Sequence, residues 1–106
     1  MKDYKTILIV EDDETLARTL SRSFERRDYE VKIASNVKEA QAILKKFHPR
    51  YAVVDLKMPG ESGLELVKYL HEFDKMIKIV MLTGYASITT TIEAIKSGAC
   101  YTNLTS

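Results

Sequence analysis

Short apolar runs that alternate with amphipathic segments constrain the fold of this chain more than any other feature. Four such runs, rich in β-branched residues or leucine, are typical of strands: residues 6–10, 29–33, 51–56 and 77–83. After each run, apolar residues recur at helical spacing, as Leu16, Leu20 and Phe24 do after the first. Four strand-then-helix units predict an α/β fold with a doubly wound parallel sheet, because each right-handed crossover places its helix against the sheet.

Helix starts and stops are also marked in the sequence. Asn36 with Glu39, and Ser62 with Glu65, form candidate capping boxes at the starts of the second and third helices. Ser87 is the expected cap of a fourth helix. That helix would turn three isoleucines to the core and stop at a glycine: Ile88, Ile92, Ile95 and Gly98.

Length and charge narrow the classes of function. The 106 residues suit one small domain, and 16 Lys+Arg against 15 Asp+Glu give a net charge of +1. This balance does not favour nucleic acid or an anionic membrane as a direct partner. The single cysteine, Cys100, excludes an internal disulfide, and the N-terminal apolar run is too short for a signal peptide. We therefore expect a cytoplasmic protein.

Acidic residues gather where the predicted strands end. Glu11, Asp12 and Asp13 follow the first strand, and Asp55 lies close to the end of the third. Two carboxylates about 5 Å apart repel by roughly 3 kcal/mol at an effective dielectric of 20, so a cluster predicts a compensating cation. Oxygen ligands alone favour Mg²⁺. Asp13 and Glu14 are explained by the start of a helix, whereas Asp55, beside a cation, is a competent nucleophile toward phosphorus.

Four motifs occur in register along the chain: Glu11-Asp12 after the first strand, Asp55-Leu-Lys-Met-Pro-Gly-Glu-Ser-Gly63, Thr83-Gly84 after Ile-Val-Met-Leu, and Gly98-Ala99. In these motifs the sequence resembles the receiver domain of bacterial two-component response regulators. The resemblance extends from about residue 6 to 99 and implies a flavodoxin-like (CheY-like) fold for a single receiver domain over residues 1–106.

The resemblance implies a role for each matching position. Asp55 would accept a phosphoryl group from the phosphohistidine of a sensor kinase. Asp12 and Asp55 would ligate Mg²⁺ directly, Glu11 through water, and Lys57 through its backbone carbonyl. Thr83 would hydrogen-bond a phosphoryl oxygen. Such a domain takes part in its own phosphoryl transfer and dephosphorylation without being an enzyme that turns over a separate substrate.

Three further positions would modulate the phosphorylated state. Gly84 leaves space for the approach of Thr83, while Lys57 and Tyr85 flank the path of the hydrolytic water; each of these two is equally well explained as a solvated loop residue. The two histidines, His48 and His71, are expected on the surface.

The C-terminal segment departs from the family pattern. In ungapped register the aromatic switch position holds Thr102, with Tyr101 one place early, and the switch lysine position holds Thr105. We therefore expect an incomplete fold that stops before the fifth strand and helix, with an irregular tail from about residue 100. The fourth strand would then be an open edge and one sheet face would expose apolar surface, which a homodimer could cover.

The alternatives differ in chemistry. A protein-interaction module with the same fold could work without phosphorylation, because the switch lysine is missing. An aspartate-nucleophile phosphatase would need a second acid where Lys57 stands, and no nucleotide-binding glycine motif is present. The leading interpretation is a phosphoacceptor that regulates an output, by analogy transcriptional, absent from this chain.

Overall fold

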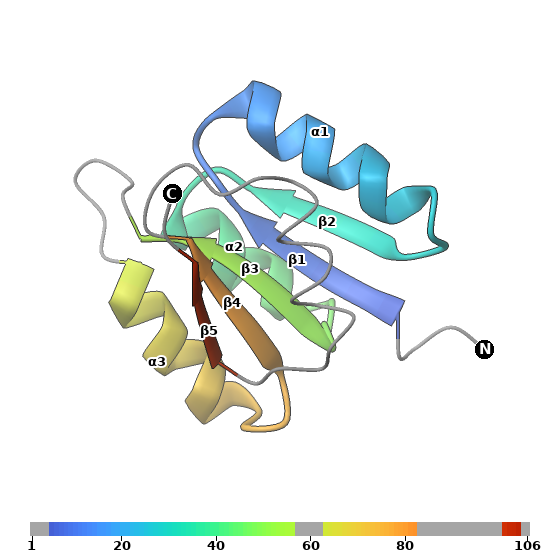
Figure 1. The fold of residues 1–106 in the computed structure, drawn as a ribbon. Helices are drawn as coiled ribbons and strands as arrows, with labels where there is room; N and C mark the ends of the chain where they lie inside the picture. The colour runs from blue at the N-terminus through green and yellow to red at the C-terminus, as the bar shows by residue number, and fades with distance from the viewer. Residues whose placement is uncertain (1–4, 57–62, 83–100, 105–106) are drawn as a thin grey trace.

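Five parallel strands form one sheet, in the order β2-β1-β3-β4-β5 (Figure 1). The computed structural model describes residues 5–56, 63–82 and 101–104. The elements are β1 (Thr6–Val10), α1 (Glu14–Glu25), β2 (Glu30–Ala34), α2 (Val37–Leu44), β3 (Tyr51–Asp55), α3 (Gly63–Phe73), β4 (Lys78–Leu82) and β5 (Tyr101–Leu104). The predicted alternation of strands and helices is confirmed over these residues.

The sheet separates two apolar cores, because successive side chains of a strand point to opposite faces. On one face, Ile7 and Ile9 of β1 pack in a cluster with Leu20 and Phe24 of α1. The other cluster combines Leu8 and Val10 with residues of α2 and α3: Ala40, Leu44, Leu66, Val67 and Leu70. Figure 1 shows the corresponding layers, with α1 on the opposite side of the sheet from α2 and α3. β1 and β3 are therefore buried on both faces.

Side-chain caps fix where α1 and α2 begin. Asp13 caps α1, and its Oδ1 accepts a hydrogen bond from the Leu16 N–H at 3.1 Å. Asn36 caps α2 in the same way, accepting from the Glu39 N–H at 2.8 Å. Glu39 reaches back to Ser35, whose N–H and hydroxyl both donate to its Oε1 at 2.8 Å. The predicted capping box is present in a form shifted by one residue, because its return hydrogen bond comes from the residue before the cap.

β2 is an edge strand within the described residues, and it is the most exposed of the strands whose side chains are described there. Glu30 and Lys32 face solvent, as their alternation with apolar residues predicts. Tyr29 and Val31 pack against the α1 side of the core, whereas Ile33 remains 41% exposed. The prediction that β2 has one less-buried face is confirmed, and Ile33 of the same strand is exposed as well.

The expectation that the sheet lacks a fifth strand is wrong. β5 pairs in parallel with β4, with Ile79 opposite Tyr101 and Leu82 opposite Leu104. Ladder hydrogen bonds are made by the backbone, so a strand can form there without the family's usual side chains. The predicted open edge of β4 is consequently covered by β5, so it does not supply the uncovered edge on which the expected homodimer depended.

The predicted exposure of one sheet face is also not observed where the side chains are described. Val53, Val80 and Leu82, which lie on the α1 side, are at most 2% exposed. The segment 83–100, which includes the predicted helix after Ser87, and residues 105–106 lie outside the described residues. Among the helices that are described, none combines the length and apolar character needed to cross a bilayer.

Candidate functional site

The register of the sheet brings two acids together. β1 and β3 are neighbours, and Val10 is paired with Val54. The residues that follow this pair are Glu11 and Asp55, so both carboxylates lie at the carboxyl edge of the sheet. Carboxylate oxygens of Glu11, Asp12 and Asp55 lie within 4.8 Å of one another. The convergence predicted from the sequence is therefore confirmed for these three acids, whereas Asp13 caps α1.

Backbone hydrogen bonds hold the turn between β1 and α1. The Glu11 N–H donates to the carbonyl of Ala34 in β2 at 3.0 Å, which extends the β1–β2 pairing past Val10. The Glu11 carboxylate turns back and accepts from the Asp13 N–H at 3.1 Å. Asp13 in turn caps α1. Asp12, between them, is left exposed and is the acid of the cluster most open to solvent.

Asp55 is held at the end of a paired strand. It is 9% exposed and is the last residue of β3, opposite Leu82 of β4. The next residue, Leu56, still donates its N–H to the Leu82 carbonyl at 2.9 Å. Because the backbone on both sides of Asp55 is fixed by β4, its side chain is presented from a rigid element.

Burial changes the charge of the cluster. Glu11 is 4% exposed, and the loss of hydration raises its pKa from 4.5 to about 8. The Asp13 N–H opposes this rise, whereas the adjacent carboxylates of Asp55 and Asp12 add to it. Without a cation, burial and the neighbouring carboxylates therefore favour the protonated form of Glu11. Sequence reasoning missed this property, because the order of acids along a chain does not show which of them the fold buries.

The donor set suits a hard divalent cation. All three side chains offer carboxylate oxygens, and neither sulfur nor imidazole belongs to the cluster. At 4.8 Å and an effective dielectric of 20, two of these charges repel by roughly 3 kcal/mol, which a bound dication would reverse. Mg²⁺ prefers oxygen ligands and commonly takes one or two protein carboxylates. The residues present fit such an ion.

Several predicted site residues lie outside the described residues. These are Lys57, Thr83, Gly84, Tyr85 and Thr105. Thr102 lies in β5, where its backbone is paired with Val80. The two histidines are exposed as predicted. His48 also forms a hydrogen bond of 2.6 Å with Asp74, which lies between α3 and β4.

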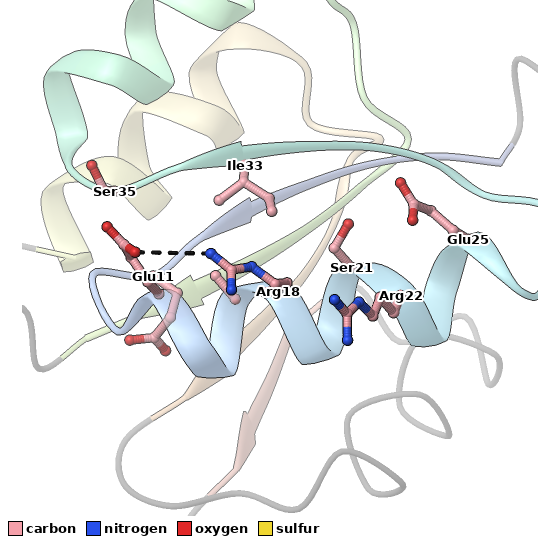
Figure 2. A pocket seen from close by; sticks show the side chains of 9 residues that line it. Glu11, Arg18, Ser21, Arg22, Glu25, Ile33 and Ser35 are labelled. Carbon is pink, nitrogen blue, oxygen red and sulfur yellow. Dashed lines mark ion pairs between the residues drawn. The ribbon is translucent and has the colours of Figure 1, made fainter.

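A shallow groove of about 270 Å³ borders the cluster on the β2 side (Figure 2). It runs between α1 and β2, with Glu11 at one end and the exposed Ile33 on its β2 side. The Arg18 guanidinium in its wall lies 4.0 Å from the Glu14 carboxylate, the ion pair marked by the dashed line. Glu11 therefore belongs both to the acidic cluster and to the lining of this groove.

The fold and the acidic cluster define a signalling domain of two-component systems. Residues 7–102 match the family described as the response regulator receiver domain. The chain belongs to this family, whose general role is to accept a phosphoryl group, and its members are signalling proteins rather than classical enzymes.

Among curated proteins, the chain is similar to the photosynthetic apparatus regulatory protein RegA of Rhodobacter capsulatus. The two are 39% identical over 95 residues, which is 90% of this chain and 52% of RegA. The regulatory protein AtoC of Escherichia coli is 30% identical over 88% of this chain and 20% of its own. The chain therefore spans about half the length of RegA and a fifth of AtoC.

Solved structures show the same fold. A receiver domain protein from Methanospirillum hungatei gives a TM-score of 0.76 at 32% identity, over 95% of this chain and 80% of that one. A response regulator from Burkholderia pseudomallei, solved with a phosphorylated aspartic acid, a calcium ion and citrate, gives a TM-score of 0.75 at 38% sequence identity. That match covers 93% of this chain and 58% of the other.

Proposed function

We propose that Asp55 is the phosphoacceptor of this receiver domain and takes its phosphoryl group from a sensor histidine kinase. The observation that carries the proposal is the position of Asp55, 9% exposed at the end of β3, with its carboxylate within 4.8 Å of those of Glu11 and Asp12. A carboxylate that is both fixed and close to a cation site is suited to attack phosphorus. The phosphorylated aspartate of the Burkholderia pseudomallei relative supports the same chemistry.

In the proposed reaction, an Asp55 oxygen forms a bond to phosphorus while the phosphorus–nitrogen bond of the kinase phosphohistidine breaks. The electron pair of that bond returns to the imidazole nitrogen. Asp12 and Asp55 would hold Mg²⁺, with Glu11 through water and the Lys57 carbonyl completing the ligands. The metal supplies neutralisation of the charge on the transferring group. A dication beside Glu11 would favour the ionised form of its carboxyl group and so oppose the effect of burial on its pKa.

Residues after β4 and in the β3–α3 connection would complete the site. By resemblance, Thr83 hydrogen-bonds the phosphoryl group and Gly84 admits that approach. Lys57 and Tyr85 set the lifetime of the acyl phosphate through the access of water. The phosphorylated domain would act in the cytoplasm on a transcriptional output.

A second candidate function rests on Thr105, which occupies the family's switch lysine position in ungapped register. Without an ammonium group there, phosphorylation would be weakly coupled to conformational change. The domain would then act as a protein-interaction module that does not depend on phosphorylation.

Intact mass spectrometry after incubation with acetyl phosphate and Mg²⁺ separates the two functions. We expect a gain of one phosphoryl group in the wild type and none in Asp55→Asn, with the oligomeric state recorded in the same sample. Retained Mg²⁺ binding with no mass gain would exclude the phosphoacceptor role and leave the interaction module. A gain that persists in Asp55→Asn would assign the modification to another residue.

A further inference from the structure

Gly63, the first residue of α3, lies against the backbone that carries Asp55. A Cβ built on Gly63 would be 2.7 Å from the Asp55 carbonyl oxygen and 2.8 Å from the Leu56 Cα. It would also be 2.8 Å from the Leu56 Cδ2. Two of these three atoms belong to the main chain, which cannot turn aside as a flexible side chain can.

The lack of room for a side chain explains why a glycine stands at position 63. Its backbone conformation does not, because its φ lies outside the left-handed region that favours glycine. The obstructing backbone is also fixed on its other side. Asp55 is paired with Leu82 of β4, and the Leu56 N–H donates to the Leu82 carbonyl at 2.9 Å. A larger residue at position 63 would therefore push either α3 or the end of β3 out of place.

We propose that Gly63 is a positioning residue for the phosphoacceptor: the absence of its side chain lets α3 begin directly against the Asp55–Leu56 backbone and fixes Asp55 relative to Glu11 and Asp12. This inference rests on the proposed function of Asp55, and it adds a residue that touches neither phosphate nor metal. The first turn of α3 thus supports the site from outside the acidic cluster.

The size of the effect follows from the distances. Relieving the contact from 2.7 Å to an ordinary 3.4 Å requires a displacement of about 0.7 Å. A misplacement of about 1 Å can cost roughly a hundredfold in rate. If the end of β3 takes up part of the displacement, Gly63→Ala should phosphorylate roughly tenfold more slowly from acetyl phosphate at saturating Mg²⁺. Its Mg²⁺ affinity, measured by calorimetry, should fall in the same direction.

Val67→Ala is the matched control, because Val67 lies one turn further along α3 and is buried in the core on that face. Urea unfolding midpoints are measured for both variants. This comparison separates a loss of rate caused by lower stability from a loss caused by misplacement of Asp55. A tenfold loss confined to Gly63→Ala supports the proposal. Equal rates and Mg²⁺ affinities in the two variants would overturn it.

A double variant, Gly63→Ala with Leu56→Ala, tests which contact matters. It removes the Leu56 side chain but keeps both main-chain contacts, so the defect should persist. Recovery of the wild-type rate would show that only a side chain was displaced and would refute the positioning role. If the wild type itself is not phosphorylated, the proposed function fails, and the Mg²⁺ affinities of the same variants decide the inference about Gly63.

Discussion

The proton on Glu11 makes the stability of the metal-free domain depend on pH in a defined direction. The pKa of Glu11 is raised from 4.5 to about 8, chiefly because the carboxyl group is buried. Between these pH values the folded chain binds a proton that the unfolded chain releases, so the free energy of unfolding must fall as pH rises. The stabilisation is complete below about pH 4.5 and lost once the pH passes about 8.

The magnitude follows from the same two pKa values. Each pH unit between the two pKa values corresponds to about 1.36 kcal/mol. The Glu11 proton therefore contributes at most about 5 kcal/mol to the free energy of unfolding. Water that enters the site on ionisation reduces this penalty, so we expect on the order of 3 kcal/mol between pH 5 and 8. For a domain of this size that is a large fraction of the total stability.

The assay is urea unfolding in EDTA at several values between pH 5 and 8, for the wild type and for Glu11→Gln. The difference between the two isolates Glu11, because other titrating groups contribute to both. We expect the wild type to lose stability relative to Glu11→Gln as pH rises. Asp55→Asn should make the free energy of unfolding depend less steeply on pH, since the Asp55 charge is one cause of the raised pKa of Glu11.

Added Mg²⁺ provides a second test of whether the Glu11 proton causes the pH dependence. A dication favours the ionised carboxylate, so Mg²⁺ should stabilise the wild type more at pH 8 than at pH 5.5, where protons compete with it. A difference between wild type and Glu11→Gln that stays constant with pH would refute the reasoning, because it would mean that Glu11 is already ionised in the folded chain.

Two further predictions concern the supporting fold. Phe24 is fully buried and packs edge-on against Tyr29 with ring centroids 5.2 Å apart, so Phe24→Ala should cost about 3–5 kcal/mol in urea unfolding; a cost under about 1 kcal/mol would contradict the assigned core. Asn36→Ala removes the cap of α2 and should cost about 1 kcal/mol by the same method, while Asn36→Asp, which keeps an acceptor, should stay close to the wild type.

The sequence was sufficient for the parts of the site that depend on strand ends. The apolar runs of β1 and β3 are each followed or closed by acids, and parallel strands place their carboxyl ends on one edge. Asp55 and Glu11 could therefore be placed together before their distances were known. The cap Asn36 was also predicted, and Asp13 was placed at the start of a helix, because helix starts depend on local sequence.

Other features depend on packing between distant segments. β5 was not predicted, because a short strand held by backbone pairing to β4 leaves little signal in its side chains. The raised pKa of Glu11 depends on how deeply the fold buries that carboxyl group. The role of Gly63 depends on the approach of α3 to the end of β3. Each of these features depends on contacts between segments far apart in the sequence, which the spacing of residues along the chain does not show.

The burial of β1 and β3 on both faces limits where this domain can change during evolution. A polar group inside either strand would enter one of two packed cores, so new chemistry can arise only at the strand ends and in the connections that follow them. Those connections tolerate variation far better than the strands. Changes in those connections would alter the surroundings of the acidic cluster, while the pairing of β1 with β3 keeps Glu11 and Asp55 in place.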